Sequence, residues 1–117
     1  MRSLHALPWI IAGAAFVAYP ALRPYADESS LAGLAAMGSI RWLVAHLLGM
    51  VGFVALAAGL QALSGRARLA SLAVVLLLPY YGGETFGLYA IGQAAERTGD
   101  VGLLGVVDGF RYQPVAQ

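Results

Sequence analysis

The sequence has no cysteine and no lysine, and only 11% of its 117 residues are charged. Without cysteine there are no disulfides, no thiolate metal ligands and no cysteine nucleophile. The seven basic residues are all arginines scattered along the chain, so no basic patch indicates a nucleic-acid partner. Soluble domains carry about 25% charged residues, so the low charge content excludes an ordinary soluble domain.

Motifs typical of soluble enzymes are also absent. The sequence has no Gly-Lys phosphate loop, no nucleophile elbow and no pair of histidines at zinc-binding spacing. We therefore predict no metal site and no cofactor, and the sequence gives no reason to predict enzymatic activity by this chain alone.

Hydrophobic residues make up 60% of the sequence and gather in three long stretches, at residues 4–22, 42–63 and 69–91. Each stretch is close to the ~20 residues that a helix needs to cross a bilayer. Backbone groups in hydrocarbon must be hydrogen-bonded internally, which favours helices over isolated strands. The sequence thus predicts an all-α integral membrane helical bundle, with three transmembrane helices in a single domain over residues 1–117.

Two shorter segments complete the predicted architecture. After Asp27 and Glu28, two serines precede Leu31, Leu34 and Met37, a pattern that predicts a short, capped amphipathic helix in the first loop. The apolar tail over residues 101–110 is too short to span a bilayer, so we expect it at the membrane interface.

The arginines of the second loop predict the topology. Residues 64–68 contain two arginines and no acidic residue, which places this loop in the cytoplasm by the positive-inside rule. With three spans, the N-terminus is then also cytoplasmic, and the chain from residue 92 onward lies outside.

A stripe of small residues runs along the second stretch. The stripe lets another helix backbone approach closely, as small residues do in membrane helix pairs. We interpret it as a packing surface within the chain, with an oligomerisation face as the alternative. Its members are Ala45, Gly49, Gly52, Ala55 and Gly59.

Glu84 is the only acidic residue well inside a predicted span. An intramembrane carboxylate is costly to bury and is therefore a functional-site hypothesis by default. On a continuous helix, Tyr80 and Tyr81 lie one turn before Glu84 and offer phenol donors to its carboxylate. Pro79 and the pair Gly82 and Gly83 are expected to kink or break the helix here. Broken helices in membrane proteins often line a binding site.

His46 is the second residue of this candidate polar centre. Counting residues from the same end of the two antiparallel helices places His46 ~6 Å deep and Glu84 ~10 Å deep, so a contact between them is geometrically allowed. Arg41 is expected just above them at the interface.

Several roles for this centre stay open. A carboxylate and an imidazole that exchange a proton suit a relay or a proton-linked transport component, and the same groups suit a quinone or another polar ligand. The alternative is a network that only fixes helix register, in a structural or cofactor-anchoring subunit of a membrane complex.

A haem anchor would need paired histidine ligands. His5 opens the first span and His46 opens the second, so they lie near opposite membrane faces, roughly 20 Å apart in depth. Haem or quinone binding therefore requires a partner chain. We expect the bilayer as surroundings, with a second copy or a membrane-complex subunit as partner.

Three segments resemble a group of actinobacterial multi-pass membrane proteins of unknown activity. These segments are residues 45–53, residues 78–88 and the run Arg111-Tyr112-Gln113-Pro114. The resemblance implies a location in the bacterial cytoplasmic membrane and marks His46 and Glu84 as a recurring pair. It also implies further spanning helices after the last segment, so that this chain is shortened at its C-terminus.

Overall fold

The computed structural model describes residues 2–64 and 67–112, and every regular element within them is helical. The first two long helices are α1 (Arg2–Leu22) and α3 (Ile40–Leu63). The third is one continuous helical run, made of α4 (Arg68–Gly82), the π-helical segment η2 (Gly83–Gly87) and α5 (Leu88–Thr98). All three are long and apolar enough to cross a membrane, which confirms the predicted all-helical fold with three such helices.

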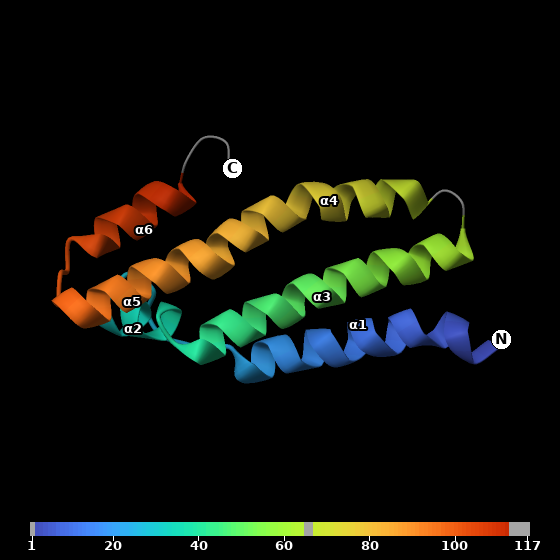
Figure 1. The fold of residues 1–117 in the computed structure, drawn as a ribbon, viewed down its shortest axis with the longest axis horizontal. Coiled ribbons are helices and arrows are strands. Elements are labelled where there is room, and N and C mark those ends of the chain that lie inside the picture. Colours follow the sequence, from blue (N-terminus) through green and yellow to red (C-terminus); the bar gives the residue numbers. More distant parts are fainter. Residues whose placement is uncertain (1, 65–66, 113–117) are drawn as a thin grey trace.

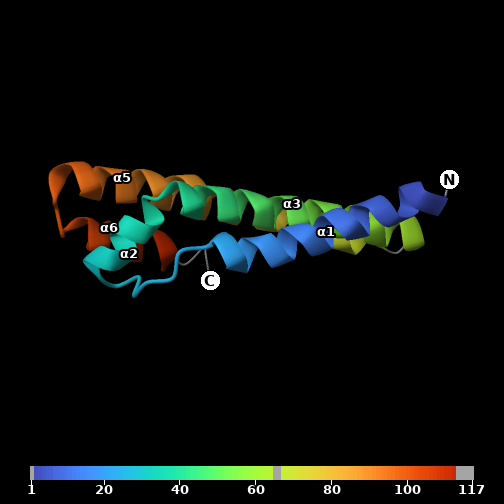
Figure 2. The ribbon, with the colours of Figure 1, turned by 90° about the horizontal axis from the view of Figure 1, so that it is seen from below.

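The three long helices lie side by side, with α3 between α1 and α4 (Figure 1). The start of α1, the end of α3 and the start of α4 lie at one end, while α2 (Leu31–Met37) and α6 (Leu103–Arg111) lie at the other. The view in Figure 2 shows a thin molecule, with extents of 54 × 29 × 18 Å. α1 and α4 flank α3 on two sides, and one strip along α3 stays exposed.

The small-residue stripe of α3 lies against aromatic rings of α1. A Cβ atom added to Gly52 would lie 2.8 Å from the ring of Phe16. The same holds for Gly59, whose added Cβ would lie 2.8 Å from the ring of Trp9. Glycine on one helix and a large ring on the other therefore set the distance between α1 and α3, as a packing surface requires.

The third helix does not break at Pro79 and the glycine pair, but its α-helical winding is interrupted there by the π-helical segment η2. Gly82 and Gly83 both have right-handed helical backbone angles, with φ of −63° and −59°. Pro79 stays inside α4, and the helix widens into the η2 turn immediately afterwards. Glycine permits a break without requiring one, and the continuous helix extends past residue 91 to Thr98.

At the end away from the N-terminus, α5 packs with two short helices to form what we call the cap: α2 (Leu31–Met37), α5 and α6 (Leu103–Arg111). Ser30 begins α2 by accepting a hydrogen bond from the Gly33 amide, so the predicted capped helix is present. The predicted tail is α6, which folds back toward α5 and η2 (Figure 1). The buried core of the cap and the adjoining end of α3 consists of Leu34, Met37, Trp42, Leu88 and Val107.

Candidate functional site

The carboxylate of Glu84 is paired with an arginine from the C-terminal helix of the cap. Glu84 lies in η2 with 15% of its side chain exposed, and its Oε1 accepts a hydrogen bond from Nε of Arg111 at 3.1 Å. Arg111 is the last residue of α6, and 17% of its side chain is exposed. A charge-assisted hydrogen bond of this kind is roughly twice as strong as one between neutral groups.

Arg111 is shared between two carboxylates, since its Nη1 also donates to Oε2 of Glu28. The other oxygen of Glu28 accepts from Nη2 of Arg23, just after the end of α1. Burial alone lowers the pKa of Arg111, but the two carboxylates outweigh it, so the pKa of Arg111 is raised above its usual value. Glu84, Arg111, Glu28 and Arg23 form a neutral set, which we call the charged cluster.

The turn before α2 holds Glu28 in this position. The amide and the hydroxyl of Ser29 both donate to Oδ1 of Asp27, and the hydroxyl of Ser30 donates to the Asp27 carbonyl. The two hydrogen bonds from Ser29 lower the pKa of the Asp27 carboxyl, and the one from the hydroxyl has the larger effect. The turn directs Glu28 toward the two arginines, so a local serine and aspartate motif positions one member of the charged cluster.

An aromatic chain leads from the charged cluster to His46. The guanidinium of Arg23 lies 5.4 Å from the ring centre of Trp42, in cation–π range. Trp42 stacks on His46 with ring centres 4.1 Å apart, and Nδ1 of His46 lies 2.8 Å from the Trp42 carbonyl oxygen. A carbonyl oxygen only accepts, so Nδ1 carries the proton in this contact and Nε2 is the acceptor nitrogen of a neutral ring.

Glu84 and His46 lie at a similar level along the helices, whereas counting residues predicts depths about 4 Å apart in the same leaflet. The ring of Tyr81 lies 3.7 Å from the Cβ that Gly49 would carry, and the ring of Tyr19 lies 3.3 Å from it. Glu84 and His46 each lie three residues from this contact toward the cap, which is about 4.5 Å. That level is where α1 ends.

The structure brings only some of the predicted site residues together. His46 is 1% exposed, and its ring contacts those of Tyr19 and Tyr81 at centre distances of 5.4 and 6.4 Å. Within the described ranges no hydrogen bond joins Glu84 to His46, Tyr80 or Tyr81, although Glu84 acts electrostatically on His46.

Tyr80 and Arg41 take no part in the ion pairs of the charged cluster. Tyr80 lies one helical turn before Glu84, but it is 40% exposed and, among the described residues, makes no hydrogen bond to the carboxylate. Arg41 donates from Nε to the carbonyl of Leu22 at 3.2 Å. It therefore caps the end of α1.

Sequence reasoning missed the partners of Glu84. Arg111 is 27 residues away and belongs to a tail that was expected only to lie at the interface. The sequence feature that could have pointed to this ion pair was a single arginine at the end of an apolar segment. Glu28 and Arg23 carried no signal beyond their charge, because the turn that joins them to Arg111 is a tertiary contact.

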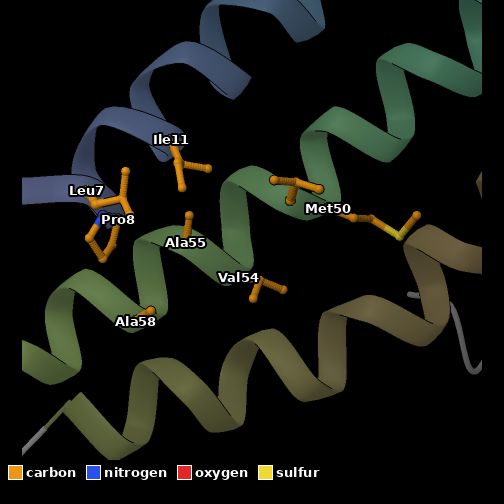
Figure 3. Close-up of a pocket in the computed structure, with 8 residues that line it drawn as sticks. Leu7, Pro8, Ile11, Met50, Val54, Ala55 and Ala58 are labelled. Atoms are coloured by element: carbon orange, nitrogen blue, oxygen red, sulfur yellow. The ribbon is translucent and has the colours of Figure 1, made fainter. Parts of the chain in front are cut away.

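An apolar groove lies between α1 and α3, with a volume of about 460 Å³ (Figure 3). Its lining side chains carry no polar atom able to orient a polar ligand, so it is not part of the polar centre. From α1 it is lined by Leu7, Pro8 and Ile11, and from α3 by Met50, Val51, Val54, Ala55 and Ala58.

No metal cluster is present in the described part of the chain, where no three His, Asp or Glu side chains are close enough to hold an ion. His5 lies near the start of α1 and His46 near the start of α3, and these helices are antiparallel. The two histidines are therefore about 25 Å apart along the helix axes and cannot ligate one haem.

No protein family, no curated protein and no solved structure matches the chain.

Proposed function

We propose that the chain is a structural subunit that spans a membrane and packs laterally against other membrane helices, either a second copy of itself or another subunit of a complex. On this proposal the three long helices form the membrane layer and the cap lies at one membrane surface. The charged cluster fastens the cap to the layer.

The exposed strip of α3 carries this proposal. α3 is the most apolar of the three long helices and lies in the middle of the layer, yet one strip along its length is exposed. The strip repeats at alternating spacings of four and three residues, which is the periodicity of a seam between packed helices. It consists of Ile40, Val44, Leu47, Val51, Val54 and Ala58.

The groove beside the strip supports the same proposal (Figure 3). Val51 and Val54 belong both to the strip and to the groove lining. Helix packing inserts side chains of one helix into gaps on the other, and a groove next to a regular strip offers such gaps. Small and β-branched side chains keep the surface flat enough for close approach.

The charged cluster supports a structural role over a proton relay. A carboxylate that relays protons must gain and lose its proton, whereas Glu84 is held beside Arg111, which stays protonated. His46 is stacked on Trp42 and hydrogen-bonded to the backbone carbonyl of the same residue. These contacts fix positions and satisfy charges.

For location we propose the bacterial cytoplasmic membrane, with the N-terminus and the α3–α4 connection in the cytoplasm and the cap outside. The support is that Arg2, which begins α1, and Arg68, which begins α4, lie at one end of the layer, where the positive-inside rule favours the cytoplasm. The cap, with both acidic and basic residues, lies at the other end.

A tryptophan at Val51 tests the packing face. Val51 is exposed in the middle of the α3 strip, so Val51→Trp should block close helix approach and reduce the assembled fraction at least tenfold, as measured by native mass spectrometry in mild detergent. The matched control is Val75→Trp, because Val75 is also an exposed valine but lies on α4. Assembly that both variants lose equally, or that neither loses, would contradict the proposal.

A proton-linked or small-ligand transport component is the second candidate. One observation favours it: Glu84 lies in a π-helical segment, a feature frequent at functional sites, at a level similar to that of His46. Transport through this centre predicts that proteoliposomes carry a proton flux that Glu84→Gln abolishes while helicity and melting temperature stay near wild type. The structural proposal predicts no flux above that of empty liposomes in either protein.

A cofactor-anchoring role remains a variant of the structural proposal. His46 has its Nδ1 occupied by the Trp42 carbonyl, so Nε2 is the nitrogen that would ligate haem iron, with the second ligand from a partner chain. A Soret band that shifts on reduction of the membrane-extracted protein, and that is lost in His46→Ala, would support this variant. A colourless preparation would exclude haem.

A further inference from the structure

We propose that α6 is a hinged lid over the π-helical segment, and that its position decides whether the Glu84 carboxylate is covered or accessible. This inference does not depend on the proposed function.

The lid closes on a surface without side chains. The ring of Phe110 lies 3.0 Å from the position that a Cβ atom of Gly83 would take, and 3.4 Å from that of Gly87. These two glycines begin and end η2, so the ring rests on bare helix backbone on either side of Glu84. A side chain at either position would reduce the space that Phe110 now occupies.

Arg111 holds the lid in the closed position. It is the last residue of α6 and bonds to Glu84 in η2 and to Glu28 in the loop before α2. These two carboxylates belong to segments far apart in the sequence, and Arg111 joins both. With the lid closed, the Glu84 side chain is mostly covered and its charge is balanced.

The connection before α6 has the properties of a hinge. Gly99 has φ of +66°, a left-handed conformation that glycine adopts without strain, and Gly102 lies directly before the helix. α6 has nine residues, of which Val107 is buried and Leu104 and Phe110 are partly buried against the same core. Isolated helices this short are marginal in water. Elements with few buried apolar contacts open at low free-energy cost.

Opening would separate Phe110 and Arg111 from η2 together, because both lie at the same end of α6. Glu84 would then lose its arginine partner and lie between two glycines that have no side chains to cover it. Glu28 would remain as the other carboxylate that Arg111 had joined. A nine-residue helix is about 13 Å long, so a rotation of about 45° about the hinge moves its far end by about 10 Å.

Spin-label distances test the lid, and the absence of native cysteine makes labelling specific. One label replaces exposed Tyr112, directly after the far end of α6, and the other replaces exposed Ile40 on α3. We expect one narrow distance distribution in the otherwise native chain and a second population, shifted by about 10 Å, in the double variant Phe110→Ala/Arg111→Gln. Asp108→Asn, an exposed change on the same helix, should leave the distribution unchanged.

A second label pair separates a lid from a general loss of structure. Labels at Val17 on α1 and Val54 on α3 should report the same distance in the double variant as in the native background, because the lid does not touch this pair. Glu84 should also react at least fivefold faster with a water-soluble carbodiimide when the lid is released. An unchanged α6 distance, a shift in both pairs, or unchanged Glu84 reactivity would each overturn the proposal.

Discussion

Alanine in place of Gly92 should destabilise the cap more than any other single methyl group added to this chain. A Cβ atom at Gly92 would lie 2.2 Å from the backbone nitrogen of Gly38 and 2.7 Å from the carbonyl oxygen of Leu34. These are backbone atoms, so the clash is relieved only when α5 and α2 move apart. We expect a loss of about 3 kcal/mol, near the upper end of overpacking costs.

Separating the helices would also break the hydrogen bond from Nε2 of Gln93 to the Gly38 carbonyl, which is 2.5 Å long. Thermal unfolding in detergent, followed by circular dichroism, measures the loss. The control is Gly105→Ala on α6, where an added Cβ meets nothing within 4 Å and alanine should be neutral or stabilising by up to about 1 kcal/mol. Equal melting temperatures for Gly92→Ala and the native protein would refute the close crossing of α2 and α5.

Leucine at Gly52 should separate α1 from α3 and lower the free energy of unfolding by about 3 kcal/mol. An added Cβ would lie 2.8 Å from Cε1 of Phe16, and the rest of the leucine side chain has no room beside the ring. Alanine should cost less, because a flexible aromatic side chain can shift by a few tenths of an ångström. The melting temperature and the distance between spin labels on α1 and α3 report both effects.

Two comparisons make this prediction specific. Gly13→Leu places the same side chain on α1 where a Cβ meets nothing within 4 Å, and it should leave the melting temperature near that of the native protein. Adding Phe16→Ala to Gly52→Leu should recover part of the lost stability, because it removes the ring that the leucine displaces. If Gly13→Leu and Gly52→Leu are equally damaging, the contact between Gly52 and Phe16 is not what holds α1 against α3.

The helices could be predicted because their signals are local. Apolar runs of about 20 residues identify the three long helices, and Asp27 with two serines identifies the start of α2. The continuity of the third helix could not be predicted in the same way. Pro79 and the glycine pair permit both a break and a π turn, and the packing of Phe110 against Gly83 is a contact from a distant segment.

The candidate site could be predicted only in part. An acidic residue in an apolar stretch draws attention to Glu84, and counting residues along antiparallel helices places Glu84 and His46 in the same leaflet. The bond to Arg111 depends on how α6 folds back, which no periodicity encodes. Tyr80 shows another limit, because one residue of helical rotation decides whether a side chain points inward or outward, as the contrast with Tyr81 illustrates.

The central claim is that the chain works as a laterally packed membrane subunit, and the mass of the particle extracted from its native membrane tests it most directly. Native mass spectrometry in mild detergent should give either a whole-number multiple of the chain mass or a stoichiometric complex with another membrane protein, and Val51→Trp should reduce that particle to single chains. A native protein that leaves the membrane as a single chain, with no copy or subunit attached, would contradict the account.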